Sequence, residues 1–252
     1  MTFDVAAEAY DRFMGRYSRP LAPQLADLAG VQAPQRALDV GCGPGALTAE
    51  LVGRLGAAGV VAADPSEPFV EAARQRHPGV EVALAPAEDL PFVDAGFDVA
   101  LAQLVVHFMS DPVAGLAEMR RVTRDGGLVA ACVWDHGGGQ GPLSPFWRAV
   151  AHLDPDAPDE SDLAGAREGQ LAALFGEAGL VDVEDDALWV HAEHATFEEW
   201  WEPYTLGVGP AGVYVSGLGA GARAELRDRC RALVGDGPVT LTMRAWAARG
   251  RA

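Results

Sequence analysis

ALDVGCGPGA, residues 37–46, is the stretch of this chain that decides the fold. An apolar lead-in containing one acid, Asp39, is followed by glycines at alternate positions and then by Leu47–Leu51, which has helical spacing. This pattern predicts a strand, a tight loop and a helix. Glycines allow the positive φ angles of such a loop and let a ligand approach the bare main chain. The stretch therefore predicts a ligand-binding turn between a strand and a helix.

The chain after residue 36 continues to alternate strands with helices. Short apolar runs predict the strands, and the segments between them have helical spacing. The predicted strands are residues 36–40, 60–63, 80–85, 97–102 and 128–134, and the predicted helices are residues 46–55, 66–77 and 113–122. Repeated strand–helix units with short turns indicate an α/β fold with a doubly wound, parallel sheet. The ligand of such a sheet binds at the carboxyl ends of the strands.

Regions on both sides of this core add further elements. Apolar residues from Val5 to Tyr17 predict an amphipathic helix that ends at residues 18–20, and a second short helix follows up to Gly30. The first helix either packs on the sheet or closes over the ligand. Beyond residue 134 we predict helices at 145–153, 170–178 and 222–234, a helix opened by the capping box Thr196–Glu199, a glycine-rich stretch at 207–221, and strands from 180 and over 239–247.

Composition limits the partners that this chain can have. Its 252 residues carry a formal net charge of −17, which repels phosphate backbones and anionic membranes. No apolar run approaches the ~20 residues of a membrane span, and the first residues lack the pattern of a secretory signal. Three scattered cysteines, Cys42, Cys132 and Cys230, suit neither a disulfide framework nor a zinc site. We therefore expect a cytoplasmic protein with no metal, no nucleic acid and no membrane partner.

Two kinds of ligand fit the glycine loop. Gly41, Gly43 and Ala46 satisfy the dinucleotide spacing G-x-G-x-x-G/A, and Asp64 follows the second strand, where a ribose-binding acid is expected. An NAD(P)-dependent oxidoreductase is therefore one interpretation. Asp39, however, places a carboxylate beside the loop, which would repel a pyrophosphate and attract a ligand with an ammonium and a sulfonium group.

Four successive blocks resemble a known family. ALDVGCGPGALTAEL, VVAADPSEPFVEAAR, AEDLPFVDAGFDVALAQLVVHFMSDP and EMRRVTRDGGLVA are similar to the blocks of class I S-adenosylmethionine-dependent methyltransferases. The resemblance covers residues 36–135, and extends more loosely to YDRFMGRYSRPLA, FEEWWEPY and LTMRAWAARG. It implies a Rossmann-like, mostly parallel seven-stranded sheet in a single domain over residues 1–252. Residues 1–30 would form a helical lid, residues 36–135 the cofactor-binding core, and residues 136–169 and 196–221 a cap on the acceptor side.

The resemblance also implies a binding site for S-adenosylmethionine. The loop Gly41, Cys42, Gly43 and Gly45 would lie against the methionine part of the cofactor, with Asp39 near its amino group. Asp64 would accept both ribose hydroxyls. The remaining cofactor-binding residues that it implies are Pro65, Ala87 and Glu88 at the adenine, Gln103 near the methionine, and Tyr10, Arg16 and Ser18 from the N-terminal region.

Some of these residues have a structural alternative. Asp39 could cap a turn, Asp64 a helix, Glu88 could be a solvent-facing loop acid, and Gln103 could simply end its strand. One position departs from the family pattern: Pro86 stands where similar proteins often have Asp or Asn before the Ala-Glu pair, to accept from the adenine amino group. A backbone carbonyl or Glu88 would have to substitute.

His107 is the first candidate for catalysis. It follows the fourth strand, where an imidazole could take a proton from an acceptor as a general base, or could simply pack beneath the loop with its apolar neighbours. Asp135 and His136, after the fifth strand, are either further bases or loop residues. Five aromatic residues outside the core could wall an apolar substrate pocket or form the core of a cap: Trp147, Trp200, Trp201, Tyr204 and Tyr214.

The function implied by the resemblance is transfer of a methyl group to a small molecule by direct in-line displacement. A sulfonium methyl is an electrophile, so the protein must mainly align a nucleophile and exclude water. We expect an apolar or aromatic acceptor, with oxygen, nitrogen and carbon all open as the methylated atom. Besides the oxidoreductase, the alternative is a non-methylating relative that binds the same cofactor.

Overall fold

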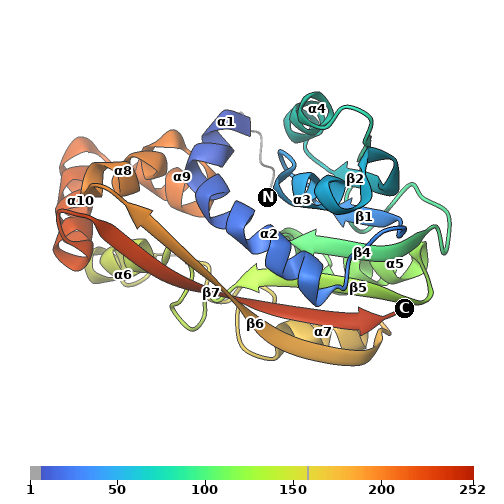
Figure 1. The fold of residues 1–252 in the computed structure, drawn as a ribbon. Helices are drawn as coiled ribbons and strands as arrows, with labels where there is room; N and C mark the ends of the chain where they lie inside the picture. The colour runs from blue at the N-terminus through green and yellow to red at the C-terminus, as the bar shows by residue number, and fades with distance from the viewer. Residues whose placement is uncertain (1–6, 158) are drawn as a thin grey trace.

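The computed structural model describes residues 7–157 and 159–252 and contains a seven-stranded sheet (Figure 1). The strands are β1 (Ala37–Val40), β2 (Val60–Asp64), β3 (Glu81–Leu84), β4 (Phe97–Gln103), β5 (Thr123–Trp134), β6 (Val181–His194) and β7 (Val239–Arg251). Their order across the sheet is β3-β2-β1-β4-β5-β7-β6. Only the pairings of β7, with β5 and with β6, are antiparallel within the described sheet. The predicted mostly parallel, doubly wound fold is therefore confirmed.

Helices cover both faces of the sheet. The helical elements are α1 (Ala7–Tyr10), η1 (Asp11–Gly15), α2 (Arg16–Leu28), α3 (Ala46–Leu55), η2 (Ala57–Gly59), α4 (Glu67–Arg76), η3 (Val106–Phe108), α5 (Pro112–Val122), α6 (Ser144–Leu153), α7 (Gln170–Glu177), α8 (Phe197–Trp201), η4 (Glu202–Leu206), α9 (Gly209–Gly217) and α10 (Ala220–Val234). Along β4 successive side chains point to opposite faces. Leu101 joins the core beneath α2 and α3, and Ala100 joins the core above α5 and α7.

The N-terminal helix is longer than the sequence pattern predicts. We expected a break at residues 18–20, but helical structure runs without interruption from Ala7 to Leu28, through a π-helical turn over Asp11–Gly15 and past Pro20 inside α2. Tyr17, Leu21 and Leu25 are buried at four-residue spacing against the sheet, and their burial outweighs the cost of about 3 kcal/mol that an interior proline carries. Val5, part of the predicted apolar face, lies outside the described residues.

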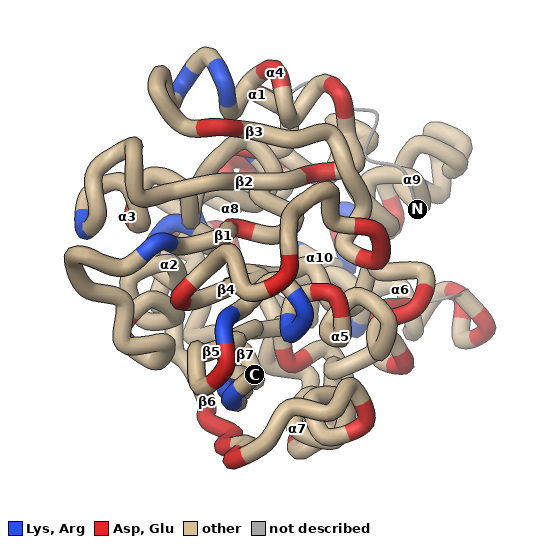
Figure 2. The backbone as a smooth tube through the Cα atoms, turned by 90° about the vertical axis from the view of Figure 1, so that its right-hand side faces the viewer, with Lys and Arg blue, Asp and Glu red and all other residues tan. Residues whose placement is uncertain are grey.

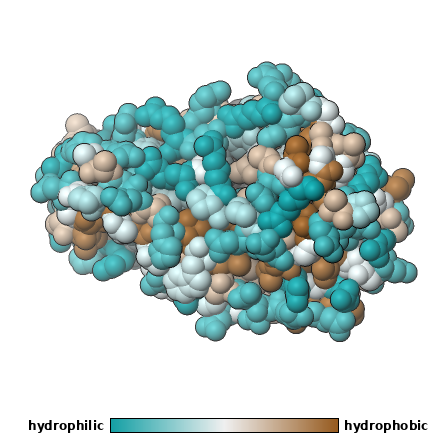
Figure 3. All heavy atoms as spheres, in the orientation of Figure 1, coloured by the Kyte–Doolittle hydropathy of each residue, from teal (hydrophilic) through white to brown (hydrophobic). Residues whose placement is uncertain are grey.

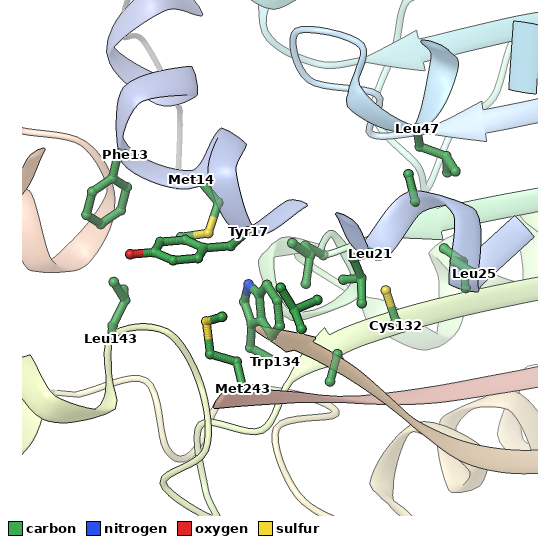
Figure 4. Packing of buried hydrophobic residues seen from close by; sticks show 14 of the residues in the cluster. Phe13, Met14, Tyr17, Leu21, Leu25, Leu47, Cys132, Trp134, Leu143 and Met243 are labelled. Carbon is green, nitrogen blue, oxygen red and sulfur yellow. The ribbon is translucent and has the colours of Figure 1, made fainter. Parts of the chain in front are cut away.

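The last two strands carry a cap over the carboxyl edge of the sheet. β5 pairs with β7 only over Ala245–Arg251, whereas Val239–Arg244 pairs with β6 alone. This extension leads away from the sheet to α6, α8, α9 and α10, as Figure 1 shows. The core under α2 continues into the cap without a break. In Figure 4, the ring of Tyr17 extends toward Phe13 and toward Leu143 in the cap, and the side chain of Met14 points toward Tyr17.

The surface fits the acidic composition. Acidic residues occur on most of the elements in the end-on view of Figure 2, where basic residues are fewer. The face in Figure 3 is largely hydrophilic. Exposed large hydrophobic residues, among them Val93 and Val213, come from separate segments of the chain. Among the described helices we find none that is long and apolar enough to cross a membrane.

Candidate cofactor and acceptor site

The glycine loop leaves β1 and is tied at once to β2. The backbone N–H groups of Gly41 and Cys42 both donate to the carbonyl of Ala63, at 2.7 and 3.0 Å. Gly43 has a φ of 54° and open space where a Cβ atom would stand. A Cβ on Gly41 would lie 2.5 Å from Val105, and one on Gly45 would collide with His77. Only Gly43 of these three glycines therefore presents an open side, whereas a Cβ at the other two positions would displace a neighbouring side chain.

Two buried acids flank the loop. Asp64 accepts from the backbone N–H of Gly43 through Oδ2 and from that of Ser66 through Oδ1, both at 2.8 Å. Asp39 is 1% exposed and accepts from the Thr48 hydroxyl at 2.6 Å. Burial raises the pKa of Asp64, and it raises the pKa of Asp39 to about 7. The structure thus gathers both predicted acids and the loop at the carboxyl edge of the sheet.

Ser18 and Gln103 meet beside this edge. The Gln103 side-chain amide donates to the carbonyl of Ser18 at 3.0 Å. The hydroxyl of Ser18 and the side-chain oxygen of Gln103 are both buried, and neither has a hydrogen-bond partner among the described residues. Buried polar atoms left in this way cost free energy unless a ligand or water satisfies them. The pair fits the polar end of a bound cofactor.

The other two N-terminal candidates lie in different surroundings. Tyr10 packs edge-on against Phe69 with ring centroids 5.3 Å apart, and burial, followed by the charge of Asp64, raises its pKa. The Arg16 guanidinium lies 2.9 Å from Glu199 in the cap and 2.8 Å from Nδ1 of His194 in β6. Arg16 therefore joins the N-terminal helix to the cap and is not among the groups gathered at the glycine loop.

A basic pair that the sequence analysis missed does contact the loop. Arg76, at the end of α4, donates to the carbonyl of Pro44 at 3.2 Å and pairs with Asp11 at 2.6 Å. The next residue, His77, lies 3.1 Å from the carbonyl of Gly45 through Nε2. The only signal in the sequence was the basic character of the residues that end this helix.

The predicted adenine side has partners of its own. Glu88 accepts from the backbone N–H groups of Ser110 and Asp111 at 2.6 and 3.2 Å, and so holds the loop that leads into α5. Ala87 is buried in the core on the α5 side of the sheet, whereas Pro65 and Pro86 are exposed. Contact of Pro65, Ala87 and Glu88 with a cofactor stays a prediction.

A cavity opens at the carboxyl ends of β4 and β5. It is lined by Tyr10, Phe13, Met14, Leu104, His107, Phe108, Trp134, His136, Leu143, Glu160, Val208, Gly209 and Pro210. The segment 103–108 borders both regions, because Val105 packs on Gly41 while Leu104 and His107 line the cavity. Leu104 has a φ of 62°, a strained conformation for a branched side chain that is typical of functional sites.

The five aromatic residues outside the core fit the second of their two interpretations, the core of a cap. None of Trp147, Trp200, Trp201, Tyr204 and Tyr214 lines the cavity. They form instead the core of the cap, in which Tyr204 stacks on Phe146 with ring centroids 4.6 Å apart. Trp200 and Tyr204 also border a small surface depression beside Arg16. The aromatic walls of the main cavity come from Tyr10, Phe13, Phe108 and Trp134.

Two imidazoles and one carboxylate are the ionisable groups of the cavity besides Tyr10. His107 is 7% exposed, and its ring centroid is 5.8 Å from that of His136. Burial lowers the pKa of His107 well below its ordinary value and that of His136 to about 4. Glu160 lies 4.0 Å from Nδ1 of His136, and burial raises its pKa to about 7. The described residues contain no cluster of three or more potential metal ligands.

Asp135 is not available as a base. It is fully buried and receives two hydrogen bonds from the Arg244 guanidinium, at 2.6 and 3.0 Å. Its other oxygen accepts from the backbone N–H of Gly138 at 2.8 Å. The residue therefore joins β7 to the loop after β5, which corrects its interpretation as a catalytic candidate.

Comparison with known proteins identifies the core. Residues 38–131 match the family model described as a methyltransferase domain. A trans-aconitate 2-methyltransferase from Methylobacterium radiotolerans is 32% identical over 174 residues, or 69% of this chain and 65% of that protein. A malonyl-[acyl-carrier protein] O-methyltransferase from Pseudescherichia vulneris is 34% identical over 148 residues, or 59% of this chain and 57% of that protein. The chain thus spans less than two thirds of the length of either relative.

One solved structure is similar over nearly the whole chain. It is described as a candidate type II methyltransferase from Anaeromyxobacter dehalogenans and is 27% identical, with a TM-score of 0.64 over 94% of this chain and 97% of that one. The domain match, the relatives and the shared fold agree with the four sequence blocks. Residues 38–131 are a methyltransferase domain, and the chain is similar in sequence and fold to the class I S-adenosylmethionine-dependent methyltransferases.

Proposed function

We propose that this protein transfers a methyl group from S-adenosylmethionine to a small-molecule acceptor held in the cavity at the ends of β4 and β5. The observation that carries the proposal is the contact between Asp64 and Gly43, 2.8 Å long, which fixes an acid of β2 against the open glycine of the loop. When bound, the cofactor supplies a methyl group on a positively charged sulfur. The protein then has to hold two molecules in line and keep water out.

The side-chain oxygens of Asp64, Ser18 and Gln103 can each accept a further hydrogen bond from the cofactor. The two oxygens of Asp64 have each accepted one backbone hydrogen bond and keep a further lone pair for a ribose hydroxyl. The unpaired oxygens of Ser18 and Gln103 are acceptors suited to an ammonium group. We propose these residues as cofactor ligands, and α1 with η1 as the lid over them.

The acceptor is a small molecule in this proposal because the cavity is narrow and mostly apolar. Most of the residues that line it are apolar or aromatic, as in small-molecule sites. The net charge of −17 opposes a nucleic acid. The two relatives are named for carboxylate-bearing acceptors, trans-aconitate and a malonyl carrier protein, so acceptors of several sizes occur within the family.

The two alternatives make different predictions about ligands. An oxidoreductase would bind NAD, which would bring a pyrophosphate beside Asp39 and Asp64. A non-methylating relative would bind S-adenosylmethionine and transfer nothing.

Calorimetry with S-adenosylhomocysteine and with NADH separates these functions. We expect micromolar binding of the first and none of the second, followed by methyl transfer to members of an acceptor panel. Absence of S-adenosylhomocysteine binding would contradict the proposal. Tight binding without transfer to any acceptor would favour the non-methylating alternative.

A further inference from the structure

We propose that His136 is the general base of the transfer, that Glu160 positions it, and that the acceptor presents a neutral hydroxyl group on an apolar body. This inference rests on the proposed function and names the acceptor class of the same site. It starts from groups that converge on the cavity from three segments, namely the loop after β5, the segment between α6 and α7, and η3.

Glu160 is held in place as a buried carboxylate. It is 4% exposed, and its Oε2 atom accepts a hydrogen bond from the indole N–H of Trp147 at 2.7 Å. The same oxygen lies 4.0 Å from Nδ1 of His136, whose side chain is 5% exposed. A carboxylate facing one imidazole nitrogen favours the proton on that nitrogen. The proposal accordingly places the lone pair of His136 on Nε2.

The Nε2 atom of His136 has the properties of a general base. It is buried and has no hydrogen-bond partner in the described part of the chain. Burial lowers the pKa of His136 to about 4, so the ring is neutral near pH 7 and can accept a proton. The titratable groups that are electrostatically coupled to the pair are His107, Asp135, Asp159 and Tyr204. Asp135 is neutralised by Arg244.

The charge of the cavity excludes a carboxylate acceptor. No lysine or arginine is among the described residues that line it, whereas Glu160 is. A carboxylate placed there would be buried without a cation, beside a Glu160 side chain that also becomes charged above about pH 7, and both effects are unfavourable. This chain therefore differs from relatives that are named for carboxylate-bearing acceptors.

His107 distinguishes a hydroxyl from an amine. Its Nδ1 atom is also buried without a partner among the described residues. A hydroxyl oxygen has two lone pairs, so it can accept from His107, donate its proton to His136 and still attack with the second pair. A neutral amine has one lone pair and cannot both accept and attack. Oxygen is therefore the atom that fits both imidazoles.

The step balances without a further reactant. The acceptor oxygen forms a bond to the methyl carbon, and the carbon–sulfur bond breaks with its electron pair left on sulfur. The hydroxyl proton moves to Nε2 of His136. The resulting imidazolium is stabilised by Glu160, and the proton later leaves to solvent.

The first test needs no acceptor. In the wild-type protein with S-adenosylhomocysteine, nitrogen-15 NMR should show His136 as the Nδ1–H tautomer, and Glu160→Gln should reduce the population of that tautomer. His136 in the Nε2–H form would overturn the proposal, because no lone pair would then face the cavity. The tautomer of His136 is measured in the wild-type protein, so this result does not depend on whether the Glu160→Gln variant folds.

The second test uses matched acceptors on the same apolar bodies: phenol and 2-naphthol, with aniline and 2-naphthylamine, benzoate and 2-naphthoate as counterparts. We expect transfer to a hydroxyl probe and none to its counterparts. His136→Ala should lower kcat by about 10²- to 10⁴-fold with the affinity for S-adenosylhomocysteine retained. Glu160→Gln should lower kcat less and alter its pH profile. His152→Ala, a change at an exposed histidine of α6, is the control.

The outcomes separate this inference from the proposed function. Three results would overturn the inference: transfer to an amine or a carboxylate probe, no transfer to any hydroxyl probe, or an unchanged rate in His136→Ala. If S-adenosylhomocysteine still binds in these cases, the proposed cofactor site stands. Loss of that binding in wild-type protein would overturn the proposed function itself.

Discussion

The carboxylate of Asp64 accepts a hydrogen bond from the backbone N–H of Gly43 at 2.8 Å, so the acid that ends β2 holds the loop that follows β1. Its second oxygen caps Ser66 at the start of α4. One side chain therefore fixes the relative position of two strand–helix units at the edge where the cofactor is proposed to bind. This double role makes Asp64 the most informative position to change.

Asp64→Ala should weaken binding of S-adenosylhomocysteine by at least tenfold and lower the free energy of unfolding by about 2 kcal/mol. The second effect arises because the N–H groups of Gly43 and Ser66 lose a buried acceptor. Calorimetry and urea unfolding measure the two effects separately. Glu177→Ala, at an exposed position of α7, should change neither. Wild-type affinity in a folded Asp64→Ala protein would remove this residue from the proposed site.

The regular part of the fold could be predicted because each strand and helix has a local pattern. Short apolar runs that alternate with segments of helical spacing predict a doubly wound sheet, and this pattern does not depend on tertiary side-chain contacts. The predicted break of the N-terminal helix at residues 18–20 is wrong because Leu21 and Leu25 are buried against the sheet. That burial depends on the tertiary structure and has no signal in the local sequence.

The cavity could not be predicted in the same way. His136 and Glu160 come from irregular segments without periodicity, and only the cap brings them within 4.0 Å of each other. The cap aromatics have the composition of a substrate pocket, but composition does not tell a pocket wall from a packed core. The surroundings of Arg16 could not be predicted because the residue that it pairs with, Glu199, follows far along the chain.

Arg76→Met should loosen the start of the N-terminal helix without unfolding the protein. The change removes the bonds of Arg76 to Asp11 and to the carbonyl of Pro44. Half-exposed ion pairs contribute about 0.2–1 kcal/mol, so amide exchange over residues 7–15 should rise by up to about fivefold. Hydrogen-exchange mass spectrometry checks this. Arg124→Met, which breaks another ion pair, should leave amide exchange in that segment unchanged. Equal exchange in both variants would mean that the contacts of Arg76 do not hold the start of the helix.

Asp135→Asn should destabilise the fold strongly rather than act on catalysis directly. The carboxylate is fully buried and paired with Arg244 at 2.6 Å. Breaking such a pair from one side costs about 3–5 kcal/mol, since the remaining charge is left without its partner. Urea unfolding measures this loss. In Asp135→Asn with Arg244→Met the loss should be smaller than the sum of the two single losses, and additive losses would contradict a direct pair.

The pH dependence of stability offers a last prediction, on Glu160. Burial raises its pKa from 4.5 to about 7 in the folded protein, so the native state binds this proton more tightly than the unfolded chain does. The stability that the group contributes is full below pH 4.5 and is lost as the pH rises through 7. Glutamine stays neutral, so Glu160→Gln escapes this loss.

Between pH 5 and pH 8, the free energy of unfolding of the wild type should fall relative to that of Glu160→Gln by roughly 2 kcal/mol. His136 acts in the opposite direction, because burial lowers its pKa from 6.5 to about 4 and stability therefore rises with pH across that window. The comparison must for that reason be made between two proteins that both retain His136. Urea unfolding at the two pH values provides it, with Glu177→Gln as the exposed control. If the difference in the free energy of unfolding between the wild type and Glu160→Gln does not change with pH, folding does not raise the pKa of Glu160, and the prediction is contradicted.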